Sequence, residues 1–250
     1  TRSAREFVYT QLQREKLEAV PGQQAVYSDL GFMLLGAVIE EITGLGLDQY
    51  CRDKIFRPLG LQWTAFLNLE MMRRHKLQPM LEKFAPTERC PWRKRVLCAE
   101  VHDDNAYAMG GVAGHAGLFS TVDDLDRLVS CLTACYRGES TFLPSALVHE
   151  FWTRDGSVPG STWTLGWDTP SPEHSSAGEL FSPQSVGHLG FTGTSLWIDL
   201  EQQVHVIVLS NRVHPRRDND KIQAFRPVLH NAIMQAVRRE SSQQSVASSQ

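Results

Sequence analysis

The chain has 250 residues, of which 42% are hydrophobic and 21% are charged. This length and composition are typical of one large or two small globular domains with a substantial core. The formal net charge of −3 favours binding neither to nucleic acid nor to a membrane surface. No signal peptide and no apolar run long enough to span a bilayer are present, and the five cysteines contain no zinc-type Cys-x-x-Cys pair.

The first third of the chain is predicted to be helical. Residues 3–17 have the pattern of an amphipathic helix, and residues 29–43 are nearly all apolar. A helix that is apolar on every side is expected to be buried. Ser28 or Asp29 would cap its first turn, and Gly44 fits the position just after its end.

The next segments differ strongly from each other. Residues 47–56 are predicted to form a helix, and residues 63–91 are irregular or weakly helical. A basic cluster follows, made of Arg89, Arg93, Lys94 and Arg95. We expect a solvated loop here, because no regular aromatic platform for stacking nucleotide bases accompanies the charges.

Residues 100–121 form a glycine-rich segment, which indicates a loop whose backbone conformation requires glycine at several positions. It contains four side chains that could bind a metal ion, namely His102, Asp103, Asp104 and His115. Their spacing matches no zinc motif, and neighbouring carboxylates in an extended chain point to opposite sides. A hydrogen-bonded loop is therefore the favoured interpretation, and neither a metal nor a cofactor is predicted.

The second half of the chain mixes helices with strands. Ser120 or Thr121 caps a predicted helix at 122–136, and Pro144 opens another that ends near residue 154. Strands at 196–198 and 204–209 are joined by a turn at 199–203. A last amphipathic helix is expected at roughly 219–237, and the polar residues after it are typical of a disordered tail.

Three segments in this order resemble the serine β-lactamase and penicillin-binding-protein family, in particular its class C-like esterase and D-aminopeptidase branch. The first is Tyr27-Ser28-Asp29 with the helix after it, similar to the Tyr-Ser-Asn segment of the family. The second is Gly117-Leu118-Phe119-Ser120-Thr121, similar to a Gly-x-x-Ser-Thr helix start. The third is His188-Leu189-Gly190, which stands in the place of Lys-Thr-Gly or His-Thr-Gly on the edge strand of the sheet.

The resemblance covers roughly residues 3–237 and implies an α+β fold of the β-lactamase/transpeptidase type. In that fold an antiparallel sheet is flanked by helices and accompanied by a mostly helical domain. It implies a mostly helical region at residues 1–180, C-terminal strands and a helix at residues 181–238, and a disordered polar tail at residues 239–250. The chain begins at Thr1 without Met, so we expect the N-terminal part of the fold to be missing.

The resemblance also implies roles for single residues. Tyr27 would relay protons as a catalytic tyrosine whose pKa is lowered by adjacent positive charge. Asp29 replaces the usual Asn, so it would contact the substrate, hold a lysine ammonium or only cap the helix. His115 would line the substrate groove, although a histidine bonded to loop carbonyls is equally consistent with the sequence.

The edge-strand motif would form the other wall of the groove. His188 and Gly190 would orient the substrate, and the backbone N–H of Phe191 or Thr192 would contribute to an oxyanion hole. Leu189 replaces the usual Thr and removes a hydroxyl that commonly contacts a carboxylate. This departure favours an ester or another neutral acyl compound over a penicillin-like substrate.

The nucleophile of the family, the serine of a Ser-x-x-Lys motif, is not encoded in these 250 residues, because no serine has lysine three positions later. Two hypotheses follow. The chain is part of a serine hydrolase acting on an ester, amide or cell-wall-derived acyl substrate, and is inactive alone. Alternatively, it is a degenerate, non-catalytic binding module of the same fold.

Expected partners follow from the resemblance as well. They are a small-molecule or peptidoglycan-like substrate and a domain attached upstream, with no nucleic acid and no membrane segment in this chain. Members of the family are often exported to the bacterial periplasm or cell envelope, but the residues themselves indicate no compartment.

Overall fold

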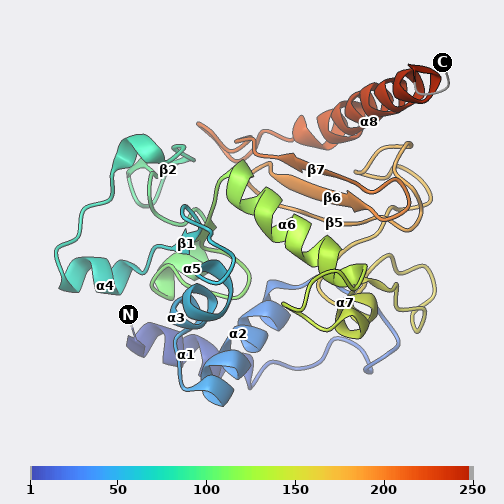
Figure 1. Ribbon diagram of the computed structural model, residues 1–250. Coiled ribbons are helices and arrows are strands. Elements are labelled where there is room, and N and C mark those ends of the chain that lie inside the picture. The colour runs from blue at the N-terminus through green and yellow to red at the C-terminus, as the bar shows by residue number, and fades with distance from the viewer. Residues whose placement is uncertain (1, 248–250) are drawn as a thin grey trace. The chain divides into compact units, whose positions relative to one another are not determined.

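The computed structural model describes the backbone of residues 2–247 and the side chains of residues 4–240. Helices and short antiparallel sheets make an α+β fold, as predicted (Figure 1). The chain divides into two compact units, one formed by Thr1–Cys131 with Val213–Arg217 and the other by Leu132–Arg212 with Asp218–Gln250. The predicted regions at residues 1–180 and 181–238 rest on the resemblance and stay a prediction.

The first unit is dominated by α2, which spans Asp29–Thr43. Its short sheets are antiparallel pairs, β1 with β4 and β2 with β3. The other elements are α1 Arg2–Leu12, α3 Leu47–Cys51, the π-helical turn Arg52–Phe56, β1 Ala65–Phe66, α4 Leu69–Arg74, the 3₁₀ turn Leu81–Lys83, β2 Arg89–Cys90, β3 Arg95–Val96, α5 Asp104–Ala108 and β4 Leu118–Phe119. The boundary between the units falls within α6, Val122–Tyr136.

The predicted ends of α2 are confirmed. The Ser28 hydroxyl caps the helix by accepting a hydrogen bond from the Leu30 N–H at 3.2 Å. Gly44 ends it in a left-handed conformation with φ of 66°, and its N–H donates to the Glu40 carbonyl. The first predicted helix is shorter than expected, because α1 ends at Leu12 rather than residue 17.

The expectation that α2 is buried on every side is wrong. Met33 and Gly36 are buried, but Leu35, Val38 and Ile42 are 58%, 49% and 79% exposed. The core beside the helix contacts one face only and consists of Leu12, Met33, Val101, Ala106, Met109 and Ala113. The apolar sequence of α2 therefore does not predict how many of its side chains are buried. That number depends on which other segments pack against the helix.

The loop before β4 comes unusually close to the backbone of α2. A Cβ atom added at Gly114 would lie 2.0 Å from the Phe32 carbonyl oxygen and 3.3 Å from the Gly36 nitrogen. Only glycine fits such a gap without moving one of the two backbones. This contact fixes the position of the residues that follow Gly114.

The second unit is built on the sheet β5–β6–β7, formed by Val186–Leu189, Ser195–Asp199 and Val204–Val208. The sheet is antiparallel with β5 at its edge, and both predicted strands and the turn at 199–203 are confirmed. Trp197 and Val206 are paired on β6 and β7 and pack in one core with Met234 of α8. The helix α7, Ser145–Trp152, completes the elements of this unit.

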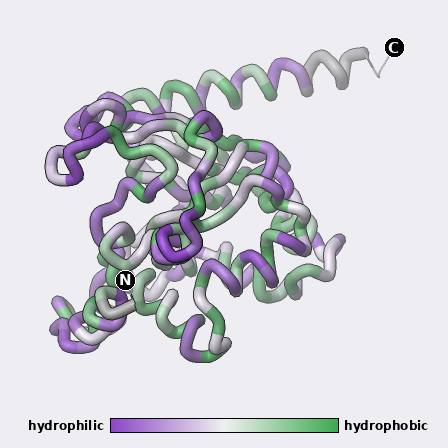
Figure 2. The backbone as a smooth tube through the Cα atoms, turned by 90° about the vertical axis from the view of Figure 1, so that its left-hand side faces the viewer, coloured by the Kyte–Doolittle hydropathy of each residue, from purple (hydrophilic) through white to green (hydrophobic). Residues whose placement is uncertain are grey.

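The last helix is longer than predicted. α8 spans Ile222–Ala247, and hydrophobic and hydrophilic residues alternate along its coloured part (Figure 2). The predicted disordered tail at residues 239–250 is therefore helical up to Ala247, and residues 248–250 lie outside the described residues.

Among the described residues, no single helix has the length and hydropathy to cross a membrane. α2 together with residues 47–56 reaches the required length and composition, but the pair is bent by 75°.

Replacing Gly114 by alanine tests the close approach to α2. We expect Gly114→Ala to lower the free energy of unfolding by about 1–3 kcal/mol, because the added methyl group forces two backbones apart. Gly31→Ala is the matched control, since a Cβ atom there meets nothing within 4 Å. Gly31 lies in the first turn of α2, where this control is expected to raise stability by no more than about 1 kcal/mol. Urea unfolding measures both changes, and equal effects would contradict the assigned contact.

Candidate functional site

Tyr27 lies immediately before the N-cap of α2 and is 53% exposed. Its ring lies against that of Phe32, with 6.5 Å between the centroids. Burial of part of the phenol and the nearby negative charge of Asp29 raise the pKa of Tyr27. The predicted lowering of this pKa is therefore wrong for the chain as described. The physical reasons are the partial burial of the phenol, which is the larger cause, and a nearby charge that is a carboxylate rather than a cation.

The glycine-rich segment brings a histidine and a carboxylate to the start of α2. The Asp103 side chain caps α5 by accepting from the Ala106 N–H at 2.7 Å. His115 Nε2 lies 2.9 Å from Asp103 Oδ1, and the His115 side chain is only 2% exposed. Burial acts to raise the pKa of Asp103, but the hydrogen bonds from His115 and Ala106 outweigh it and hold the pKa below its usual value.

The structure thus brings two predicted site residues, Asp29 and His115, together with Asp103. One carboxylate oxygen of each aspartate and one nitrogen of the histidine ring lie within 4.8 Å of one another. Of the two interpretations of His115, bonding to loop carbonyls is replaced by a hydrogen bond to the Asp103 carboxylate, and the lining of a substrate groove stays a prediction. The signal for Asp103 was present in the sequence, because Asp is favoured at the N-cap of a helix.

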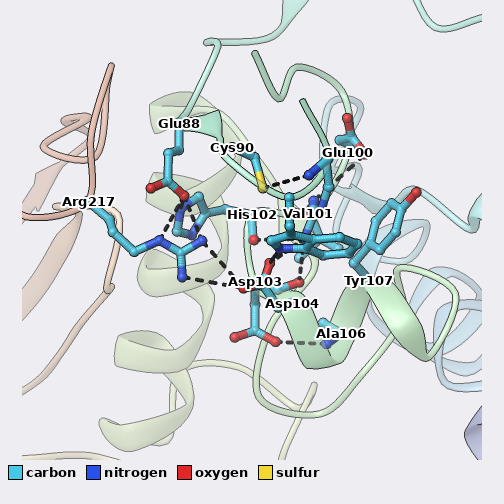
Figure 3. Close-up of polar contacts among 12 residues, drawn as sticks. Glu88, Cys90, Glu100, Val101, His102, Asp103, Asp104, Ala106, Tyr107 and Arg217 are labelled. Carbon is cyan, nitrogen blue, oxygen red and sulfur yellow. Dashed lines mark hydrogen bonds and ion pairs between the residues drawn. The ribbon is translucent and has the colours of Figure 1, made fainter. Parts of the chain in front are cut away.

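His102 and Asp104, the other two possible metal ligands in the sequence, belong to a separate network of charged residues (Figure 3). His102 Nε2 donates to the Glu88 carboxylate at 3.1 Å, and Arg217 lies 2.6 Å from the same carboxylate. Asp104 accepts from the Arg93 guanidinium at 2.8 Å. Burial lowers the pKa of His102, so its ring is neutral at neutral pH. Asp103 and Asp104 therefore face different partners, because one caps α5 and the other begins it.

The basic cluster is only in part the solvated loop that we expected, because Arg89, Lys94 and Arg95 are exposed but Arg93 is buried. The Arg93 side chain is 1% exposed and donates to the carbonyls of Val101 and His102 at 2.8 and 3.1 Å. Its guanidinium also lies 3.9 Å from the centroid of the Tyr107 ring. Arg95 forms two hydrogen bonds of 2.8 Å with the Glu100 carboxylate, and these bonds raise the pKa of Arg95. Sequence reasoning missed these contacts because the partners lie in a neighbouring loop.

In the second unit, His188 lies on the edge strand β5, as predicted. Its Nδ1 lies 2.9 Å from the Leu189 carbonyl oxygen. A carbonyl only accepts, so Nδ1 carries the proton and the neutral ring offers Nε2 as an acceptor. Burial lowers the pKa of His188 and favours this neutral form. A neutral ring of this tautomer does not donate to a substrate carboxylate, which limits the role predicted for His188.

The turn after β5 is tightly closed. The Gly190 N–H donates to the Thr194 carbonyl at 2.9 Å, and a Cβ atom at Gly190 would lie 2.0 Å from Thr194 Oγ1. Phe191 is 61% exposed at the tip, and its carbonyl accepts from Arg212 Nε at 2.7 Å. The Thr192 carbonyl accepts from the Arg212 N–H at 2.8 Å. The carbonyls of both oxyanion-hole candidates are thus held by one arginine.

Arg226 holds the same turn from α8. One of its guanidinium nitrogens donates to the carbonyls of Gly190 and Thr194, both at 2.8 Å. The residue is 7% exposed, and burial lowers the pKa of its guanidinium. No sequence signal connects a helix residue to a turn more than thirty positions earlier, so Arg226 and Arg212 were not predicted as positioning residues.

The acid dependence of stability tests the Glu88 network. The hydrogen bond from Arg217 outweighs burial and lowers the pKa of Glu88. A depressed carboxylate pKa stabilises the folded state above the unfolded value of about 4.3, and this contribution is lost as pH falls through the folded pKa. We expect Glu88→Gln to lower the free energy of unfolding at pH 7 by about 1–3 kcal/mol.

The difference between Glu88→Gln and the original protein should shrink as the pH falls below about 4.3. Glu18→Gln is the control, because Glu18 is exposed, and it should change stability little. Urea unfolding at pH 7, 5 and 3.5 measures the effect. A loss that stays constant over this range would contradict the assigned pKa.

The tautomer of His188 is open to direct measurement. We expect ¹⁵N–¹H NMR of the imidazoles to show protonated Nδ1 and a pKa below 6.5, because burial opposes the cation. The His188→Gln variant identifies its signals by their absence. Protonation at Nε2 in the neutral ring would refute the hydrogen bond to the Leu189 carbonyl.

Comparison with known proteins identifies the family. Residues 2–227 match the β-lactamase family model. An Escherichia coli K12 protein named "Putative D-alanyl-D-alanine carboxypeptidase" is 35% identical over 226 residues, which cover 81% of this chain and 48% of that protein. The chain thus spans about half the length of the curated relatives that it matches.

Two solved structures show the same fold. A β-lactamase from Mycobacterium bovis gives a TM-score of 0.58 at 22% identity, covering 88% of this chain and 67% of that one. A penicillin-binding protein from Bacillus halodurans gives a TM-score of 0.58 at 16% identity, covering 89% and 62%. With the family match over residues 2–227, these findings show that the chain belongs to the β-lactamase family of serine hydrolases and penicillin-binding proteins.

Proposed function

We propose that this chain forms part of a serine hydrolase that cleaves an ester, amide or cell-wall-derived acyl substrate. The observation that carries the proposal is the position of Tyr27, whose exposed phenol precedes the capped start of α2 in a chain of this family. The name of the Escherichia coli relative supports a peptide that ends in D-alanine as one substrate class.

The proposed chemistry requires a partner for Tyr27. In acyl transfer a serine attacks the carbonyl carbon, and a neighbouring base takes the proton of its hydroxyl. Tyr27 would handle that proton, and a lysine cation beside it would oppose the effect of Asp29 and lower the phenol pKa. The 250 residues contain no Ser-x-x-Lys, so the proposal concerns the whole protein to which this chain belongs.

The edge strand supports the choice of substrate class. His188 is neutral with Nδ1 bonded to Leu189, and Leu189 carries no hydroxyl. Neither group supplies a donor or a positive charge for a substrate carboxylate at neutral pH. This argues for recognition of the acyl part, so a neutral ester should be turned over at least as well as a peptide with a free carboxylate.

Replacing Tyr27 by phenylalanine in the whole protein tests its role. We expect Tyr27→Phe to lower kcat/KM for a p-nitrophenyl ester by about 100-fold or more, because the phenol proton relay is lost. Tyr9→Phe is the matched control, since the Tyr9 hydroxyl donates to the Glu40 carboxylate at 3.3 Å, away from Tyr27 in the part of the chain that the structure describes. Its activity should stay within about twofold, as for a change outside the site. Unchanged turnover in Tyr27→Phe would reject the assigned role.

A non-catalytic binding module is the second candidate, favoured by the absence of Ser-x-x-Lys from the 250 residues. A fluorophosphonate and a fluorescent penicillin distinguish the two, because both label an activated serine. The enzyme hypothesis expects labelling of the whole protein and a Ser-x-x-Lys encoded before Thr1. A folded protein that binds a D-alanyl-D-alanine peptide without being labelled would establish the binding module instead.

A further inference from the structure

Two side chains in successive turns of α8 hold the hairpin of the second unit. Arg226 donates to the carbonyls of Gly190 and Thr194, both at 2.8 Å. His230 lies four residues later, and therefore on the same face of the helix, with its Nε2 atom 3.0 Å from Ser195 Oγ. Ser195 is the first residue of β6 and directly follows the turn. α8 thus contacts both the turn and the strand after it.

The protonation state of His230 follows from its two hydrogen bonds. Its Nδ1 lies 2.8 Å from the Ser176 carbonyl oxygen, which only accepts, so Nδ1 carries a proton. In the neutral ring Nε2 is then the acceptor of the Ser195 hydroxyl. The residue is 0% exposed. The neutral ring therefore joins α8 to β6 and to the loop that contains Ser176.

The surroundings of this ring oppose a positive charge. Burial is the largest influence and lowers the pKa of His230. The hydrogen bond to the Ser176 carbonyl acts to raise this pKa, and the positive charge of Arg226 acts to lower it. The other groups that face the ring, the Ser195 hydroxyl and the Phe181 ring at 6.0 Å between centroids, are uncharged. A cation at this position would be enclosed beside another cation, which is unfavourable.

Protonation of His230 is therefore linked to its release from the fold. A released ring takes up a proton at its ordinary pKa of about 6.5, whereas the enclosed ring takes it up only at lower pH. As the pH falls below about 6.5, the released form becomes more stable relative to the enclosed form. Release breaks the bond between the ring and Ser195, next to the turn at residues 190–194.

From this geometry we propose that His230 is a positioning residue, whose neutral ring holds β6 on α8 and keeps the turn at residues 190–194 closed, and that acid opens this turn. The inference rests on the proposed function in one respect, because Phe191 and Thr192 of this turn are the proposed source of an oxyanion-hole N–H. Acyl transfer should be lost at acid pH because the turn loses its shape, although His230 touches no reacting atom.

Hydrogen exchange of the Gly190 amide tests the closing of the turn independently of turnover, because this N–H donates to the Thr194 carbonyl at 2.9 Å. In the whole protein, the protection factor of this amide should fall by about threefold to tenfold between pH 7.5 and 5.5, since opening takes up one proton. His230→Gln keeps an acceptor for the Ser195 hydroxyl but cannot be protonated, so its protection factor should stay constant. Unchanged protection in the original protein, or an equal fall in His230→Gln, would overturn the proposal.

Turnover of a p-nitrophenyl ester by the whole protein is the second measurement. The ratio of kcat/KM at pH 5.5 to kcat/KM at pH 7.5 should be about threefold or more higher in His230→Gln than in the original protein. An equal ratio in both would contradict the role of His230. A whole protein without esterase activity would reject the proposed function, and the exchange of the Gly190 amide would still decide this inference.

His149→Gln is the matched control, because His149 is an exposed histidine of the same unit, with its Nε2 3.0 Å from the Tyr136 carbonyl oxygen. It should leave the exchange of Gly190 and the kcat/KM ratio unchanged. Circular dichroism verifies that each variant is folded. If His230→Gln does not fold, Ser195→Ala replaces it, since this change removes the hydrogen bond to the ring and should lower the protection of Gly190 at pH 7.5. Unchanged protection in folded Ser195→Ala would likewise overturn the proposal.

Discussion

The packing of Gly114 against the backbone of α2 is the contact on which the candidate site of the first unit depends. A side chain at this position would collide with the Phe32 carbonyl, so the loop reaches the helix only because glycine stands there. The next residue, His115, is thereby placed beside Asp103 and the beginning of α2. A turn of the glycine-rich segment and the beginning of an apolar helix, more than eighty residues earlier in the chain, thus become neighbours.

The buried Arg93 also holds the glycine-rich segment in place, at its N-terminal end. It binds the carbonyls of Val101 and His102 and the carboxylate of Asp104, so the segment leading into α5 is held by one side chain. Burying a guanidinium is favourable only when its hydrogen bonds are made, which explains why so many acceptors gather around it. Asp104 and Glu88 are thereby occupied by arginines, whereas Asp103 faces His115.

The hairpin of the second unit carries the predicted His188-Leu189-Gly190 motif, but the His188 ring is not arranged to donate a hydrogen bond to a carboxylate. His188 lies on the edge strand where the family places its motif, but its Nδ1 proton is used by the Leu189 carbonyl. Arg226 and Arg212 hold the turn beyond it through backbone carbonyls. These contacts hold the turn and leave the His188 ring neutral, and the proposal that the strand recognises a neutral acyl group rests on that neutral ring.

The family, the α+β class, the ends of α2 and the strands of the hairpin were predictable from the residues alone, because caps, glycines and alternating apolar residues act locally. The exposure of the apolar residues of α2, the burial of Arg93 and the approach of Asp103 to Asp29 and His115 became visible in the folded chain alone. The shift of the Tyr27 pKa belongs to the same group. Asp103 and His115 meet Asp29 from more than seventy positions away. The acceptors of Arg93 lie eight to eleven positions away and the charge beside Tyr27 two positions away. In none of these cases does a local pattern specify which partner a charged side chain will meet.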